Sequence, residues 1–224
     1  MPPHSPASGS GWPTLPLSLP DLHHALASGR RHFPGLNLRD EDAGHLDLSD
    51  CCLRGGRFQE SRFGHARLAR ADVRRAHFQR ALLWGADLSE LRAHGSFWQE
   101  ADLSGSRLQR ADFSGALLHR ACLQGVVAAD SHWQGARLVE ADFRSGLDQL
   151  SDLGRANFRG ADLSFAQLPE ANLRQANLQG SCLYGADLSM ACLQEADLRG
   201  CDLSETRLEG ARLEGARLPK GFGL

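Results

Sequence analysis

Residues 151–220, read in blocks of five, run SDLGR ANFRG ADLSF AQLPE ANLRQ ANLQG SCLYG ADLSM ACLQE ADLRG CDLSE TRLEG ARLEG ARLPK. Each block opens on a small residue, usually alanine, and continues with a polar residue that is often aspartate or asparagine. Its third residue is leucine or phenylalanine. A repeat at a short fixed period indicates a solenoid, in which each repeat contacts only its neighbours.

A period of five fits neither an α-helix nor an uninterrupted strand. On a helix, apolar residues five apart step around the axis by about 140° and form no stripe, whereas a strand needs a period of two. Within a block, however, the small residue and the leucine are two apart, so they share one face of an extended segment. Glycine is frequent at the fifth position, where it tolerates the positive φ of tight corners. Each block therefore predicts a short strand followed by a corner.

Charged residues 20 apart alternate in sign, which predicts four blocks in each coil. Side chains one coil apart stack about 4.8 Å from each other, where opposite charges attract and like charges repel. Four columns follow this rule: Asp47, Arg67, Asp87, Arg107; then Asp50, Arg70, Glu90, Arg110, Asp130; then Glu60, Arg80, Glu100, Arg120, Glu140; and finally Asp72, Arg92, Asp112, His132, Asp152.

Tandem blocks such as ADLSG at residues 101–105 resemble the pentapeptide-repeat family, and the resemblance covers nearly the whole chain beyond residue 30. It implies an all-β fold, a right-handed quadrilateral parallel β-helix, which at 20 residues a coil would have about nine coils here. Most members of the family have no known function. A few protect DNA gyrase from quinolones or toxins by imitating duplex DNA.

The composition divides the chain into four segments. Residues 1–20 are rich in Pro, Ser and Gly and are expected to be a disordered tail, and residues 221–224 a short C-terminal tail. Between them, residues 21–30 predict a short capping helix with Asp21 as its N-cap, and residues 31–220 the β-helix. Because an open solenoid end exposes unpaired backbone groups, the helix is expected to plug it, with a free peptide arm as the alternative.

The third position of the blocks predicts the large side chains of the core. These are expected to point inward and to stack from coil to coil along the solenoid. They are Leu48, Leu53, Phe58, Phe78, Trp98, Leu103, Phe113, Leu123, Trp133, Phe143, Phe158, Leu168, Leu178, Leu188, Leu198 and Leu208.

One block breaks the pattern. In GLDQL, residues 146–150, Gly146 takes the small position and Asp148 the leucine position. A lone buried carboxylate is costly. We therefore expect this face to bulge outward at Gly146, Leu147 and Asp148, one coil above Ala128, with Leu147 or Leu150 filling the core. Bulges often mark functional sites, but the sequence favours a tolerated defect here.

No constellation in the chain indicates catalysis or a cofactor. The regular carboxylates follow the repeat, and no nucleophilic triad or phosphate-binding glycine loop is present in the sequence. The six cysteines suggest no disulfide framework. His45 and His65 should stack one coil apart, but two imidazoles without a third ligand make a weak metal site. We expect neither an enzyme, nor a metal, nor a cofactor.

The charge distribution offers the one functional clue. Arg54 and Arg74 stack on each other with no acid in their column, and Arg57, Arg75 and His94 are near. This set predicts a patch for an anion or an acidic partner, against the simpler interpretation of a solvated basic face. Towards the other end the rod becomes acidic, where Asp142 is expected to stack under Asp162 in a column with Asp102 and Asp202.

These features favour a non-enzymatic scaffold or adaptor that binds an unknown protein partner. The alternative is a DNA mimic that protects gyrase, which would need an acidic surface, a dimer and often projecting loops. A net charge of −2 gives no field that would attract nucleic acid or membranes. The N-terminus lacks the pattern of a secretory signal, so a cytoplasmic protein is expected. We expect a monomer or a weak dimer.

The columns can be tested at Glu90, which the 20-residue coil places between Arg70 and Arg110. The substitution Glu90→Arg should destabilise the protein at low salt and be partly relieved by salt, because exposed charges are screened beyond about 10 Å at 0.1 M. Adding Arg70→Glu and Arg110→Glu should recover part of the loss. Denaturation curves at two salt concentrations measure both effects. A neutral Glu90→Arg variant would refute the columns.

Overall fold

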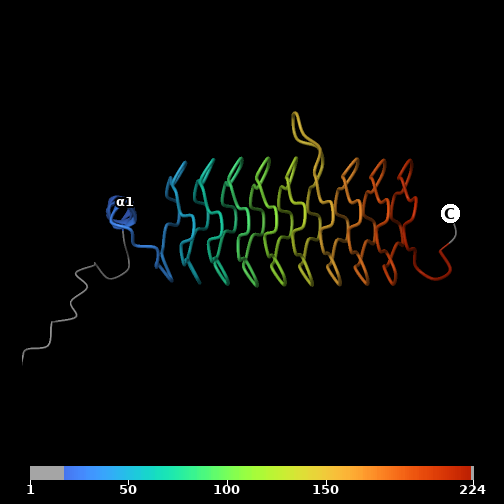
Figure 1. The fold of residues 1–224 in the computed structure, drawn as a ribbon, viewed down its shortest axis with the longest axis horizontal. Coiled ribbons are helices and arrows are strands. Elements are labelled where there is room, and N and C mark those ends of the chain that lie inside the picture. The colour runs from blue at the N-terminus through green and yellow to red at the C-terminus, as the bar shows by residue number, and fades with distance from the viewer. Residues whose placement is uncertain (1–17, 223–224) are drawn as a thin grey trace, which may run out of the picture.

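The computed structural model describes residues 18–222, and most of the predicted N-terminal tail lies outside the described residues, as do residues 223 and 224. Figure 1 shows a straight rod of stacked coils with one helix, α1 (Leu19–Ala27), beside its N-terminal end. The extended segments are too short to be named strands. Each contributes one residue to a parallel bridge with the coil above or below.

Helix α1 begins earlier than the sequence predicted. Its N-cap is Ser18 rather than Asp21, and Asp21 instead completes a capping box by accepting a hydrogen bond from the Ser18 backbone amide. Pro20 lies in the first turn, where its missing amide hydrogen costs nothing. Leu22 and Ala25 are buried in the same apolar cluster as the first coils, so the helix covers the N-terminal end of the core.

The bridges confirm the coil of 20 residues. They pair His32 with Cys52 at the N-terminal end and continue at the same spacing to Cys122 and Asp142. Exposed ion pairs run up the outside, including Asp50 with Arg70 at 2.7 Å. The four-sided coil predicted from charge is therefore correct over this part of the chain.

Residues 101–105 show how a block can use all five of its backbone amides. The second and third amides donate to the two neighbouring coils, Asp102 to the carbonyl of Ala81 and Leu103 to that of Cys122. The fifth amide, of Gly105, also donates to the next coil, and the first closes the preceding corner. The fourth amide, of Ser104, donates to the Asp102 side chain at 2.9 Å. Aspartate or asparagine recurs at the second position because its oxygen satisfies this corner amide.

The fifth residue of the blocks adopts positive φ whether or not it is glycine. The positive-φ residues include every fifth position from Gly35 to Gly215, except Ser145 and Leu150. This conformation strains a residue that carries a Cβ atom. At most of these corners the amide donates a hydrogen bond to the next coil, which favours the strained geometry.

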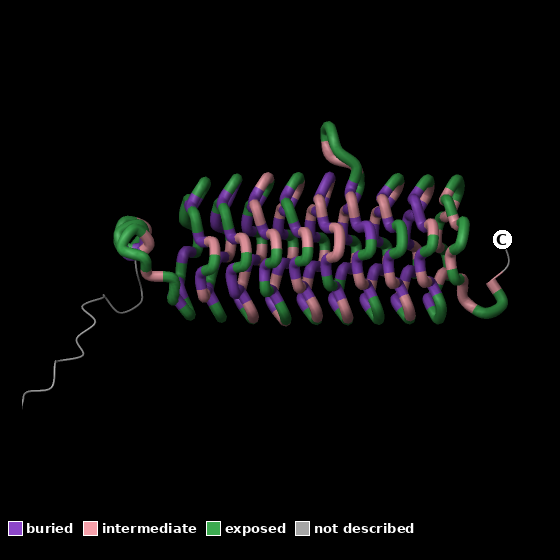
Figure 2. Tube along the Cα trace, in the orientation of Figure 1, coloured by how far each residue is buried: buried purple, intermediate pink, exposed green. Residues whose placement is uncertain are grey.

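Figure 2 shows buried positions recurring from coil to coil along the rod, and these positions hold the large side chains of the core. All the core residues predicted from the third position are buried except Leu208, which is only partly buried near the C-terminal end. Aromatic rings stack directly from coil to coil, as with Phe78 and Trp98, whose centroids are 4.1 Å apart. The Trp98 indole nitrogen donates to the hydroxyl of Ser96 at 2.6 Å, so a serine in the small position satisfies a buried donor.

Residues 146–150 do not fill the core. The whole block projects from one corner as a loop (Figure 1), with Leu147 fully exposed and Leu150 half-exposed. Asp148 therefore does not lie above Ala128, whose amide donates instead to the carbonyl of Asp152. Because one complete block leaves the coil, the inward and outward positions keep their phase on both sides of the loop.

The loop shifts every column that crosses it from a spacing of 20 to one of 25 residues. Val127 pairs with Asp152, so the predicted column from Asp72 to Asp152 ends at His132. Asp142 pairs with Gln167 rather than Asp162, so the predicted stack of two carboxylates is wrong. The column that ends at Asp130 instead gains a member that the sequence had not indicated.

That member is Arg155, which lies 2.6 Å from Asp130. The alternation of charge in this column therefore continues through the loop.

The role of the second residue can be tested at Asp102. Asp102→Asn keeps an oxygen for the Ser104 amide and should change stability little, since asparagine makes the same contact at Asn157. Asp102→Ala leaves that amide without its partner and should cost about 1 kcal/mol. Urea denaturation of both variants makes the comparison. Equal losses would show that the side-chain oxygen is not what this position supplies.

The extrusion of one complete block predicts the effect of deletions. Removing residues 146–150 should leave a cooperative fold within about 1 kcal/mol of the parent, because shortening a surface loop changes its closure entropy little. Removing only residues 147–150 leaves one residue too many for the coil. That residue must either remain as a bulge or shift the following blocks so that inward and outward positions are exchanged. The variant that lacks residues 147–150 should therefore have a lower melting temperature than the parent. The interpretation fails if both deletions destabilise the protein equally.

Candidate functional site

Four of the five residues predicted as a basic patch meet at one corner. Arg54, Arg74, Arg75 and His94 line a groove of about 520 Å³. The groove is open beside Gly55, the corner residue one coil below Arg75, which has no side chain. We refer to this feature as the basic groove. Arg57 does not line it.

Arg57 lies on the adjoining side of the coil, where it pairs with His77. Burial and the nearby Arg57 guanidinium lower the pKa of His77. The imidazole is therefore neutral at neutral pH and adds no charge to this side of the groove. His77 stacks in parallel on Phe97, with ring centroids 4.5 Å apart.

Arg54 and Arg74 are not unpaired, contrary to the sequence analysis. Both bind Asp72, whose side chain is only 2% exposed, at 2.6 Å and 2.8 Å respectively. Arg92 approaches the same carboxylate at 3.9 Å. Sequence spacing missed Asp72 because the contact with Arg54 spans 18 residues, from a corner to a neighbouring strand, and not the 20 of a column.

The basic groove keeps a positive charge after this pairing. One carboxylate faces three guanidinium groups, and Arg75 makes no ion pair within the described part of the chain. Asp72 also fixes two of these groups, since Arg74 contacts it through both Nε and a terminal nitrogen. Guanidinium groups held in this way are suited to binding carboxylate or phosphate oxygens.

The projecting loop forms a second hollow at the diagonally opposite corner. This hollow, of about 440 Å³, is lined by Trp84, by three successive corner glycines and by the loop. The glycines are Gly85, Gly105 and Gly125. We refer to it as the loop groove. The sequence analysis indicated the bulge but missed Trp84, although three glycines in one column after a tryptophan were a readable signal.

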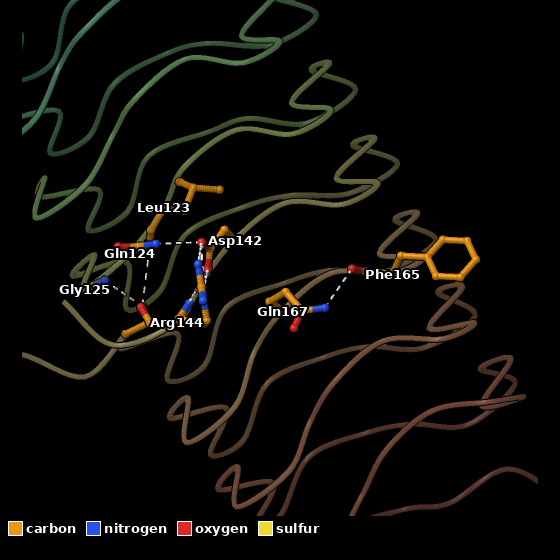
Figure 3. A network of polar contacts seen from close by, with 8 residues as sticks. Leu123, Gln124, Gly125, Asp142, Arg144, Phe165 and Gln167 are labelled. Carbon is orange, nitrogen blue, oxygen red and sulfur yellow. Dashed lines mark hydrogen bonds and ion pairs between the residues drawn. The ribbon is translucent and has the colours of Figure 1, made fainter.

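Polar contacts fix the base of the loop (Figure 3). Gln124 donates to Asp142 at 2.6 Å, and Arg144 binds the same carboxylate at 2.7 Å. The Ser151 hydroxyl accepts a hydrogen bond from the Gly125 amide at 3.0 Å. Within the loop, the Gln149 side chain donates to the Gly125 carbonyl at 3.1 Å. The loop therefore has a defined base tied to the coil below.

His45 and His65 stack as expected, with centroids 5.4 Å apart, and Trp84 packs edge-on against His65. Among residues 18–222 there is no group of three side chains placed to hold a metal ion. Burial raises the pKa of the Cys51 thiol to about 11, which makes it a poor nucleophile. In the same part of the chain, no helix is long and apolar enough to cross a bilayer.

The model of the family described as pentapeptide repeats matches residues 57–92, 86–125, 151–189 and 191–220, in eight copies. No curated protein matches the chain. Among solved structures, the chain is similar to HetL, a pentapeptide repeat protein involved in heterocyst differentiation regulation from the cyanobacterium Nostoc sp. strain PCC 7120. The identity is 31%, the alignment covers 92% of this chain and 99% of HetL, and the TM-score is 0.75.

Two further likenesses are more distant. Rfr23, a pentapeptide repeat protein from the cyanobacterium Cyanothece 51142, is 29% identical over 50% of this chain and 63% of its own, with a TM-score of 0.23. QnrB1, a plasmid-mediated fluoroquinolone resistance protein, is 19% identical over 84% of this chain and 87% of its own, with a TM-score of 0.32. From the repeat matches and the likeness to HetL, we conclude that the chain belongs to the pentapeptide-repeat family and has its right-handed quadrilateral β-helix.

Proposed function

We propose that this protein is a non-enzymatic scaffold that binds an acidic segment of a partner protein in the basic groove. The observation that carries the proposal is the contrast between this groove and the columns of paired charge. Within those columns arginines pair with carboxylates one coil away, as Arg70 does with Asp50 and Arg110 with Glu90. At the basic groove, positive charge remains beside a hollow large enough for side chains.

The rigidity of the fold supports binding rather than catalysis. Most backbone amides of a coil bond to the coils on either side, so the surface presents fixed side chains with little need to reorganise. HetL is described as involved in regulation, a role that binding alone can fulfil. We further propose that the protein acts in the cytoplasm, without nucleic acid or membrane, as a monomer or a weak dimer.

Protection of DNA gyrase is the second candidate, and the projecting loop is the observation that favours it. The paired columns weigh against it, because a mimic of duplex DNA needs a continuous acidic surface. A supercoiling assay with purified gyrase and a quinolone separates the two candidates. Protection of gyrase by a stoichiometric amount of this protein would support DNA mimicry and contradict the scaffold proposal.

Arg75 provides the sharper test of the basic groove. Arg54 and Arg74 are unsuitable, because replacing them leaves buried Asp72 short of partners and confounds binding with stability. A fluorescein-labelled oligoglutamate peptide serves as the probe in an anisotropy titration. Arg75→Gln should weaken its binding about threefold to tenfold, and added salt should weaken the parent likewise.

Arg39→Gln is the matched control, since Arg39 is also an exposed corner arginine but lies outside the groove. It should bind the peptide as the parent does. Equal binding by the parent and Arg75→Gln, or an equal loss in the Arg39 variant, would refute the assignment of this groove.

A further inference from the structure

The loop groove exists because three successive coils lack a corner side chain. Gly85, Gly105 and Gly125 occupy one column at φ values of +64°, +62° and +61°. Space also restricts Gly125, since an added Cβ atom would lie 2.9 Å from the Gly146 backbone. The loop therefore leans over a floor of bare backbone, and the hollow continues from it towards Trp84.

One end of the groove is an aromatic wall held in place by packing. Trp84 lies over Gly64, where an added Cβ atom would come within 2.8 Å of the indole, and its ring centroid is 4.4 Å from that of His65. The side chain nevertheless remains 45% exposed. A tryptophan with one side supported and part of its surface open to solvent is a typical anchor for a partner side chain.

The other end of the loop groove carries an exposed apolar side chain and a carboxylate without an ion-pair partner. Leu147 is fully exposed, although burying a leucine side chain is worth about 2 kcal/mol. Beside it, Asp148 makes no hydrogen bond or ion pair with any described residue. No cationic side chain lines the groove. The loop groove is thus mainly apolar, with the neutral polar side chains of Ser104, Gln124 and Gln149 and one free negative charge, whereas the basic groove is positive.

We propose that the loop groove binds an extended segment of a partner protein in which apolar and basic residues alternate. The basic residue pairs with Asp148, and a cation is also favoured over the face of Trp84. The apolar residue covers the corner glycines against Leu147. Trp84 and the loop lie on different coils, so the occupant must be a segment running along the rod rather than a single side chain.

The two grooves are independent. Arg75 and Gly85 are ten residues apart in a coil of 20, which places their corners diagonally opposite. One scaffold would therefore offer an acidic segment and a basic segment separate binding sites. This inference does not require that the basic groove bind anything.

Labelled peptides of alternating leucine and arginine, and of leucine and glutamate, test the proposal by fluorescence anisotropy. The arginine peptide should bind the full-length protein saturably and shift tryptophan emission, while the glutamate peptide should bind at least about tenfold more weakly. Trp84→Ala and Asp148→Asn should each weaken the arginine peptide about threefold or more, and deletion of residues 146–150 should abolish its binding.

Two controls distinguish this site from the rest of the surface. Tyr184→Ala removes an exposed aromatic side chain at another corner, and Arg75→Gln alters only the basic groove. Both should leave the arginine peptide unaffected. Asp148→Asn changes an exposed loop residue, so its effect cannot come from misfolding. Undiminished binding by the Asp148 and Trp84 variants, equal binding of the two peptides, or no saturable binding by the parent would each overturn the proposal.

Discussion

The hydrogen bonds between successive coils are the interaction on which the whole molecule depends. A block such as residues 101–105 sends three of its five amides to neighbouring coils, which leaves little freedom in its length. The coil turns by placing the fifth residue at positive φ, and the aspartate at the second position satisfies the remaining corner amide. Inside, the same spacing stacks Phe78 on Trp98, so backbone pairing and core packing reinforce each other.

Because the sides of the coil are so constrained, variation collects at the corners. Large corner side chains recur beside a glycine of the adjacent coil: Phe165 rests over Gly185, and Met190 over Gly210. Both candidate grooves are produced by this alternation. A corner glycine, Gly55, lines the basic groove beside Arg75, and three glycines in one column open the loop groove. In this protein the candidate binding surfaces are therefore a property of corner residues on an otherwise uniform rod.

The sequence was sufficient for the coil because charge and apolar side chains repeat with the same geometry that the backbone imposes. Prediction from the sequence failed where a block departs from the repeat pattern. Asp148 in a leucine position showed that the block was abnormal. Periodicity alone cannot distinguish a block that bulges outward but stays in the coil from one that is completely extruded, since both preserve the phase. It also failed at Asp72, because long arginine side chains reach across columns. Ser18 was missed as the N-cap because Asp21 is an equally good capping residue three positions later.

The central claim, that coils pair at 20 residues before the loop and at 25 across it, can be measured by cross-linking. In a background without the native cysteines, Arg137→Cys is combined with Asp162→Cys in one variant and with Asn157→Cys in another. Adjacent strands bring paired Cα atoms within the range that a disulfide spans, about 4.4–6.8 Å. Since Arg137 pairs with Asp162, mild oxidation should cross-link the first variant efficiently and leave the second reduced. Cross-linking of the Asn157 variant, with none at Asp162, would contradict the extruded loop and with it the loop groove.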